Sequence, residues 1–305
     1  MAHPASSVAR KAYKQGTSVI TSRENRWMKR FRAALAGERG DDGIVGVEGV
    51  RLVEAALGSG LTVEAVLLSD SGARHLPRVA HVLPPEVPVL RTSDRLFAGI
   101  ADTRTPQGMA ALVQPRRATI ESLLTGTPLV VALVGVQDPG NVGTIVRAAE
   151  AFGASGVASC PTDSIGTADP FGPKALRASA GSALRLPIVH GISPTILLAQ
   201  LRMSRVSVYA AVADAEGSDS RASKAQSTVL SPWVINWNGP SALLIGNEGA
   251  GLPTDLVRAA DARVYIPQAT AIAPVGIESL NAAMAASVLL YEAMRQRNAS
   301  RATHS

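Results

Sequence analysis

Polar residues in three short stretches rich in small residues could together form one reactive site. They are Asn141, Gly143 and Arg147 in the first stretch, Gly246, Asn247 and Glu248 in the second, and Glu278, Ser279 and Asn281 in the third. Amide, hydroxyl, carboxylate and guanidinium groups can orient a nucleophile and stabilise the charge that develops on it. The five histidines are scattered without metal-ligand spacing, so we expect no metal site.

The second stretch does not fit two common nucleotide-binding motifs. Residues 242–253 read ALLIGNEGAGLP. A phosphate-binding loop would place Lys and Ser or Thr after its glycines, and it would avoid an acid such as Glu248. A dinucleotide-binding turn reads G-x-G-x-x-G, whereas this turn reads G-x-x-G-x-G. A methyltransferase of the Rossmann type would also need an acid at the end of its second strand, and none ends GVASC at residues 156–160.

Apolar runs predict the strands that must position these stretches. Residues 129–136 read LVVALVGV without alternation, as in a strand covered on both faces. Further strands are predicted at residues 156–160, 205–212, 241–246 and 262–267, with helices at about 142–152 and 279–297. Because strands and helices alternate, we expect a mostly parallel sheet. Ligands bind beyond the carboxyl ends of such strands, so the three stretches should share one site.

The first third of the chain predicts a smaller α/β unit. A helix capped by Thr21 or Ser22 would carry Trp27, Phe31, Ala34 and Leu35 at helical spacing. Strands are predicted at residues 63–69 and 88–93 and within 104–115. The expected organisation is a disordered basic tail at 1–19, a first domain at 20–115, a linker at 116–127, a second domain at 128–298 and a disordered tail at 299–305. Residues 213–228 are expected to form an exposed loop.

The distribution of charge points to a polyanionic partner. The chain of 305 residues has a formal net charge of +6, and residues 1–32 contain eight Lys or Arg against one acid, Glu24. Taken alone, such a charge run is more often a solvated tail than a surface for polyanions, but four of these basic residues line one side of the expected first helix, so part of the charge is ordered. The single cysteine, Cys160, excludes an internal disulfide and fits a core position in a cytosolic protein. No apolar run reaches transmembrane length, and the N-terminus does not resemble a signal peptide.

Three motifs carry a resemblance to a known family. DPGNVGTIVRAAEAFGA, LLIGNEGAGLP and IESLNAAMAASVLLYE resemble the motifs of the SpoU (TrmH-type) RNA ribose 2′-O-methyltransferases of the SPOUT superfamily. The segments ITSRENRWMKRFRAAL, GVEGVRLVEAAL and TPQGMAALV are similar to an L30e-like substrate-binding domain that precedes the catalytic domain. KALRASAGSALRLPIV is also typical of the family, so the resemblance covers almost the whole chain.

The resemblance implies a fold, a cofactor and an assembly. It implies an N-terminal L30e-like α/β domain followed by a SPOUT α/β-knot domain with a deep trefoil knot. It further implies that S-adenosyl-L-methionine binds in that knot and that the chain forms a homodimer with the site near the interface. The segment IPQATAIAPVGIESLN is several residues longer here than in many family members, which would reshape the rim of the cofactor pocket.

The resemblance also implies roles for individual residues. The polar family positions of the catalytic site are filled by Arg147, Asn141, Glu248, Ser279 and Asn281. The cofactor would be bound by Ile245, Gly246, Asn247, Ile266, Pro267, Ser279, Leu280 and Asn281, mainly through the backbone at Gly246, Ile266 and Leu280. From the charge pattern we expect RNA to be bound by Arg23, Arg26, Lys29, Arg30 and Arg32, and Lys174 and Arg177 could either contact RNA or simply be solvated. No metal is implied.

Several positions allow a second interpretation. A guanidinium normally stays protonated, so we expect Arg147 to orient the hydroxyl beside the target phosphate rather than to act as a base. Glu248 could pair with a cation or bind backbone amides, or it could simply cap the helix that follows. Ser279 and Asn281 could be N-caps, and Asn141 a turn residue. Trp233 and Trp237 are expected to pack locally.

Taken with the resemblance, these residues predict an S-adenosylmethionine-dependent RNA methyltransferase that acts on a ribose 2′-OH. The expected target is 23S ribosomal RNA, with transfer RNA as the alternative, because an L30e-like domain is similar to domains that bind folded RNA. The alternative is a non-catalytic RNA-binding assembly factor with the same fold. The expected location is the cytoplasm, with no membrane or DNA partner.

Overall fold

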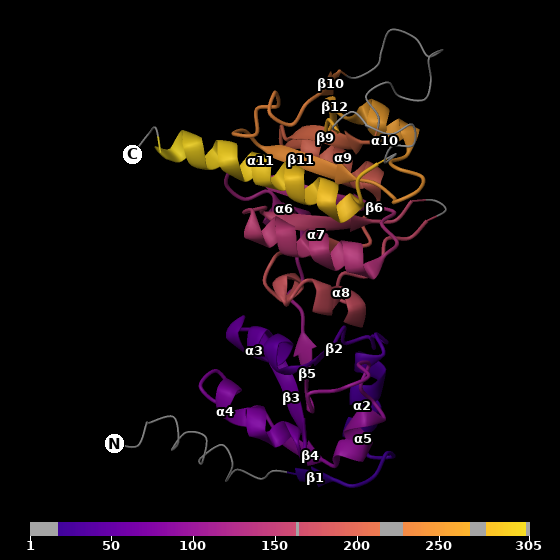
Figure 1. The fold of residues 1–305 in the computed structure, drawn as a ribbon, viewed down its shortest axis with the longest axis vertical. Helices are drawn as coiled ribbons and strands as arrows, with labels where there is room; N and C mark the ends of the chain where they lie inside the picture. Colours follow the sequence, from indigo (N-terminus) through magenta and orange to yellow (C-terminus); the bar gives the residue numbers. More distant parts are fainter. Residues whose placement is uncertain (1–17, 163–164, 214–227, 269–278, 303–305) are drawn as a thin grey trace. The chain divides into compact units, whose positions relative to one another are not determined.

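The computed structural model describes residues 18–162, 165–213, 228–268 and 279–302. Residues 1–17 of the expected basic tail, most of the expected loop at 213–228, and Glu278 lie outside the described residues. Contacts divide the chain into two compact units (Figure 1). Unit 1 contains residues 1–116 and 171–185, and unit 2 contains residues 117–170 and 186–305.

Unit 1 is built on a mixed sheet of five strands. In spatial order these are β1 (Ser18–Ile20), β4 (Val89–Thr92), β3 (Thr62–Ser69), β5 (Met109–Gln114) and β2 (Val45–Glu48). β1, β4 and β3 are mutually parallel, and β5 is antiparallel to both β3 and β2. β1 begins at Ser18, so the last two residues of the expected tail belong to a strand instead, paired with β4.

Helices cover both faces of this sheet. α2 (Arg26–Leu35) and α5 (Asp94–Ala98) share a core with β3 and β5, whereas α3 (Val50–Gly58) packs on β5 and β2 and contacts α4 (Leu76–Val79), which follows the short helix η1 (Gly72–His75). Figure 1 shows the two groups on opposite sides. The expected cap of α2 was wrong: the cap is Asn25, whose side chain accepts a bond of 2.9 Å from the backbone N–H of Trp27. Met28 is fully buried in the core under this helix, and Trp27 is partly buried against the same core.

Residues 171–185 belong to unit 1 although they lie between two strands of unit 2 in the sequence. They contain α8 (Pro173–Ala178) and the short helix η2 (Ser182–Leu184), neither of which the apolar pattern predicted. α8 packs on β2 and buries Leu176, and Arg177 forms an ion pair with Asp102. Gly37 has φ of +86°, and a Cβ added there would lie 3.1 Å from the ring of Pro173, so glycine suits this position. The expected second domain, 128–298, wrongly included residues 171–185, which belong to unit 1.

Unit 2 is built on a sheet of seven strands, and every pairing in it is parallel. In spatial order these are β10 (Val229–Leu230), β12 (Ala262–Tyr265), β9 (Ser207–Val212), β11 (Ser241–Ile245), β6 (Leu129–Val134), β7 (Gly156–Cys160) and β8 (Ile188–His190). All residues of β6, β7 and β11 are buried, as expected of strands covered on both faces. The mostly parallel α/β fold predicted from the sequence is therefore confirmed.

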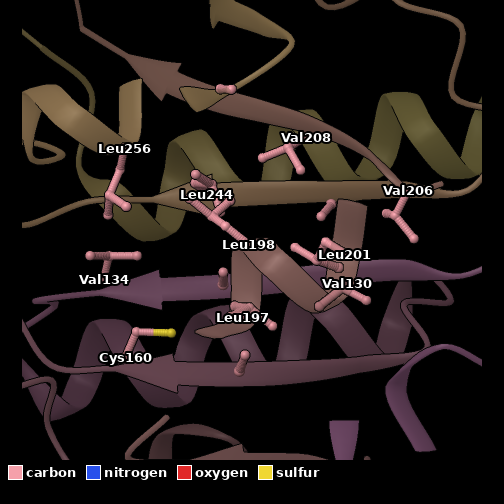
Figure 2. Packing of buried hydrophobic residues seen from close by; sticks show 14 of the residues in the cluster. Val130, Val134, Cys160, Leu197, Leu198, Leu201, Val206, Val208, Leu244 and Leu256 are labelled. Atoms are coloured by element: carbon pink, nitrogen blue, oxygen red, sulfur yellow. The ribbon is translucent and has the colours of Figure 1, made fainter. Parts of the chain in front are cut away.

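One face of this sheet is covered by α6 (Ile120–Leu123), α9 (Pro194–Met203) and α10 (Thr254–Ala259). Figure 2 shows Leu197, Leu198 and Leu201 of α9 lying against side chains of the central strands. Cys160 belongs to this core, where burial raises the pKa of its thiol to about 12. Its expected place in the core is thus found.

α7 (Pro139–Ala151) and α11 (Ala282–Ala302) pack together on unit 2. α7 begins three residues before the predicted start because the Asp138 side chain accepts from the N–H groups of Gly140 and Asn141. α11 buries Ala283, Ala286, Leu289, Leu290 and Ala293. Met284, Val288 and Tyr291, spaced at helical intervals, form an apolar stripe that faces outward: these residues are 59%, 44% and 51% exposed. The helix also continues to Ala302, past the expected end of the domain.

Arg297 attaches α11 to the loops around it. Its guanidinium donates to the backbone oxygens of Trp237, Thr127, Pro128 and Gly239, at 2.8 to 3.0 Å. Burial, and next the charge of Arg301, lowers the pKa of Arg297. The carbonyls accept most of its donors, so this half-buried cation does not depend on a carboxylate. None of the helices in the described ranges combines the length and apolarity needed to cross a bilayer.

The core under α9 gives a direct test of this packing. Leu201 is fully buried, so Leu201→Ala should lower the free energy of unfolding by about 2–5 kcal/mol. Met203 on the same helix is 78% exposed, and Met203→Ala should change it by less than about 0.5 kcal/mol. Urea unfolding followed by circular dichroism measures both. Equal losses in the two variants would contradict the orientation of α9.

Candidate active site

The three polar stretches predicted from the sequence meet at the carboxyl edge of the sheet of unit 2. The Asn141 side chain donates 2.8 Å to the Glu248 carboxylate and accepts 3.0 Å from the Asn281 amide. These residues are 107 and 140 positions away from Asn141 in the chain. Asn141 lies in the first turn of α7, after β6, Glu248 lies in the turn after β11, and Asn281 directly precedes α11. The parallel sheet brings the first two together, and the start of α11 completes the group.

The turn after β11 is closed by Asn247. Its side-chain oxygen accepts from the N–H groups of Gly249 and Ala250, both at 2.9 Å. Its side-chain nitrogen donates to the Gly135 carbonyl at 2.9 Å and to Gln137 at 3.3 Å. Both amide hydrogens are thus used within the protein. The side chain predicted to bind a cofactor instead holds the turn after β11 against the turn after β6.

Glycine is required at two positions in this turn. A Cβ on Gly246 would lie 2.5 Å from the backbone of Gly251, closer than atoms can pack. Gly251 itself has φ of +69°, a left-handed conformation that side chains disfavour. The backbone of the turn is consequently tight, and Gly246 itself adds no side chain to the pocket that it lines.

Glu248 binds the start of α7, which answers the question of what an acid does in a glycine turn. Its oxygens accept from the N–H groups of Gln137 and Asp138, both at 3.3 Å, besides the Asn141 amide. Partial burial raises the pKa of Glu248, but the Asn141 amide and the backbone N–H groups lower it by more, so the net pKa lies below its usual range. The described structure contains no ion pair between Glu248 and Arg147, and the helix that Glu248 stabilises is α7, not the α10 that follows it.

Asn281 combines two functions that the sequence left as alternatives. Its side-chain oxygen accepts from the N–H groups of Ala283 at 2.9 Å and Met284 at 3.3 Å, as an N-cap does. Its side-chain nitrogen faces Asn141. Ser279 is exposed just before this cap and lines the same pocket. One amide therefore starts α11 and connects it to the polar group.

A pocket of about 360 Å³ opens beside this polar group, within the usual size range of small-molecule sites. It lies across the ends of β11, β9 and β12 and is bounded by the first turns of α11. Its lining includes seven of the eight residues expected to bind cofactor: Ile245, Gly246, Asn247, Ile266, Ser279, Leu280 and Asn281. Pro267, the eighth, is exposed and does not line it.

Arg147 is not part of this pocket. It lies six residues after Asn141 on α7, which turns it by about 240° around the helix axis. Its side chain is exposed, as is Thr144 one turn earlier, and no hydrogen bond or ion pair to it occurs within the described part of the chain. The sequence spacing suggested that Arg147 and Asn141 serve one pocket, but helix geometry places them on different faces.

The basic residues expected to bind RNA differ in their surroundings in unit 1. Arg30 is held by Glu64 at 2.6 Å and Asp42 at 2.7 Å, and hydrogen bonding to Glu64 chiefly raises its pKa. Lys29 pairs with Glu24 at the surface, and Arg177 pairs with Asp102. The side chains of Arg23, Arg26, Arg32 and Lys174 are exposed. The basic side of α2 is thus partly neutralised by acids distant in sequence.

Several lining residues were not predicted. Ala211, Val212 and Ala213 come from the end of β9, and Ala285 and Leu289 come from α11. The small residues at the end of the predicted strand 205–212 were the available signal for the first group. Trp237 is buried, as its expected packing role requires, but Trp233 is 61% exposed and does not share it. No group of side chains in the described ranges could hold a metal ion.

Comparisons with known proteins agree with this geometry. The SpoU rRNA Methylase family matches residues 128–291, and the MRM3-like substrate binding domain matches residues 34–111. The 23S rRNA (guanosine(2553)-2′-O)-methyltransferase RlmP of Bacillus subtilis is 32% identical over 248 residues, which cover 80% of this chain and 86% of that protein.

Two further matches span both units. The 23S rRNA (uridine(2479)-2′-O)-methyltransferase of Streptomyces viridochromogenes is 31% identical and covers 91% of this chain and 92% of its own. The crystal structure of an AdoMet-bound rRNA methyltransferase from Sinorhizobium meliloti has a TM-score of 0.74 at 29% identity, covering 92% of this chain and 98% of that one. The family model covers more than half of the chain, so the protein belongs to the SpoU rRNA methylase family.

Proposed function

We propose that this protein transfers a methyl group from S-adenosyl-L-methionine to a ribose 2′-OH of 23S ribosomal RNA. The observation that carries the proposal is the hydrogen-bonded group of Asn141, Glu248 and Asn281 at the mouth of the pocket. The names of the relatives support the RNA and the position of methylation, and the AdoMet-bound neighbour supports the cofactor. We place the reaction in the cytoplasm, with no membrane or DNA partner.

The pocket fits such a cofactor. Its walls of Val264, Ala285 and Leu289 suit a flat base, and the open backbone at Gly246 can offer hydrogen bonds without a side chain in the way. When bound, S-adenosylmethionine would supply a methyl group already activated by a positively charged sulfur, and the neutral thioether S-adenosylhomocysteine would be the leaving group. The Glu248 carboxylate lines the pocket and provides negative charge that favours binding of a cation.

The remaining chemistry consists of aligning the ribose hydroxyl and assisting loss of its proton. We propose that Arg147 binds the neighbouring phosphate and stabilises the developing alkoxide, because a guanidinium remains protonated. Asn141 is held rigidly by its two partners and keeps the start of α7, and hence Arg147, in a constant position. Unit 1, with its expected substrate-binding domain at 20–115, would bind the RNA through phosphates and shape.

Arg147 can reach a pocket if two chains associate. We propose a homodimer in which each chain presents the exposed face of α7 and α11 to the other. Met284, Val288 and Tyr291 form an exposed apolar stripe on α11. The ring of Tyr291 packs edge-on against that of Phe152, which follows α7, with 5.9 Å between the ring centroids. Such stripes mark association surfaces. We further propose that unit 2 carries the deep trefoil knot implied by the resemblance.

Methylation mapping tests the function. The purified chain, 23S rRNA and tRNA would be incubated separately with labelled S-adenosylmethionine, and 2′-O-methylation would be mapped at nucleotide resolution. We expect one modified ribose in 23S rRNA, a loss of at least about 100-fold in kcat with Arg147→Ala, and little change with Thr144→Ala on the same face. Methylation of tRNA alone would redirect the proposal to that RNA. No methylation by a folded chain would favour an assembly factor.

The lowered pKa of Glu248 predicts how stability depends on pH. A carboxylate with a depressed folded pKa stabilises the fold above its ordinary value of 4.5 and loses this contribution as pH falls through the folded pKa. Glu248→Gln should therefore be less stable than wild type at pH 6, and the difference should narrow below pH 4.5. Urea unfolding across this range measures it, with Glu86→Gln at an exposed position as the control. A difference in the free energy of unfolding between wild type and Glu248→Gln that does not change with pH would contradict the proposed role of the charge.

The dimer is tested by placing a charge in the exposed stripe. Val288→Asp should convert a dimeric species to a monomer in analytical ultracentrifugation and should abolish methylation, because Arg147 would no longer meet a pocket. Met203→Asp, which charges an exposed apolar position on α9, should leave the mass unchanged. A dimeric Val288→Asp protein would place the interface elsewhere.

A further inference from the structure

The pocket has two chemically different ends. Along the sheet the order β6, β11, β9, β12 places the turn after β6 at one end and the segment after β12 at the other. Neighbouring strands are about 4.8 Å apart, so these ends are separated by roughly 14 Å. The group formed by Asn141, Glu248 and Asn281 occupies the first end. Gln268, three residues after β12, lines the second.

Between these ends the wall is made of small and apolar side chains. Ala211, Val212, Val264, Ala285 and Leu289 contribute to it. Small residues leave room for a flat ring, and aliphatic residues exclude water from its faces. These side chains cannot recognise the polar edge of that ring, so any such recognition must come from the backbone or from the few polar residues of the lining.

Of the six polar side chains in the lining, three, those of Asn247, Glu248 and Asn281, are already engaged. Asn247 uses both amide hydrogens within the protein, and Asn281 uses its oxygen as a helix cap and its nitrogen for Asn141. Within the described residues, no hydrogen bond involves the side chains of Gln268, Tyr265 or Ser279. Ser279 lies beside Asn281, at the first end. Among the residues that the structure describes, Gln268 and Tyr265 are therefore the polar side chains left at the far end.

A primary amide suits one ligand edge in particular. It presents a donor and an acceptor side by side, which matches the amino group and a neighbouring ring nitrogen of adenine. A phenol presents a single oxygen, so it cannot bond to both of these adenine positions side by side. We infer that Gln268 is a specificity-determining residue that recognises the adenine edge of the cofactor. This inference rests on the proposed function. It assigns Gln268 to selecting the cofactor, far from the methyl group that is transferred.

Calorimetric binding of two ligands tests the assignment. They are S-adenosylhomocysteine and its analogue in which unsubstituted purine replaces adenine. Wild type should prefer the adenine ligand by about tenfold or more, because the analogue leaves the Gln268 oxygen without its donor. Gln268→Leu should reduce this preference by about tenfold, whereas Tyr265→Phe should preserve it. In methylation assays Gln268→Leu should raise the KM for S-adenosylmethionine and leave kcat near wild type.

Three other results would each overturn the inference. If Gln268→Leu weakens both ligands equally, the residue only shapes the pocket, and the proposed function stands. If Tyr265→Phe removes the preference and Gln268→Leu does not, the phenol recognises the base. If the wild-type chain fails to bind S-adenosylhomocysteine at millimolar concentration, both the inference and the proposed cofactor are wrong.

Discussion

The site depends on one side-chain amide, that of Asn141. It donates to Glu248 and accepts from Asn281 at the same time, so the starts of α7 and α11 and the turn after β11 are held together by one planar group. Aspartate at this position could not donate to the carboxylate, and leucine could make neither bond. Glu248 and Asn281 each have a second attachment, to the backbone of residues 137–138 and to the cap of α11. The geometry of the pocket mouth is therefore determined from three directions.

Because of the strand order, the two ends of the sheet edge differ in chemistry. Polar groups gather where β6 and β11 end, and the apolar pocket extends under β9 and β12. An all-parallel sheet makes this possible, because every carboxyl end opens on the same edge. Arg147 stands outside the arrangement, on a different face of α7 from Asn141. The proposed homodimer would bring this guanidinium from a second copy, and the outward apolar stripe of α11 is the surface on which that proposal rests.

The sequence predicted most strands and the meeting of the three polar stretches, because apolar runs and the parallel rule determine both. It could not predict which hydrogen bonds each polar residue makes. Asn247 reads like a ligand-binding residue, yet its capacity is used to close its own turn. Arg30 reads like part of a basic surface, yet Glu64, 34 residues later, folds against it. The stripe on α11 has the spacing of a buried face, but spacing alone does not say whether a helix faces its own core or another molecule. Such facts belong to tertiary contacts that no local pattern encodes.

The excursion of residues 171–185 has a consequence for how the chain is made. A ribosome releases residues 1–116 first, yet α8, which covers part of β2, follows only after β6, α7 and β7 have been synthesised. At about 5–20 residues per second this delay lasts on the order of 3 to 14 seconds. During that interval the nascent first unit exposes the surface that later receives Leu176. Its final packing must therefore be a late event, and a fragment that ends at residue 116 would keep that apolar surface uncovered permanently.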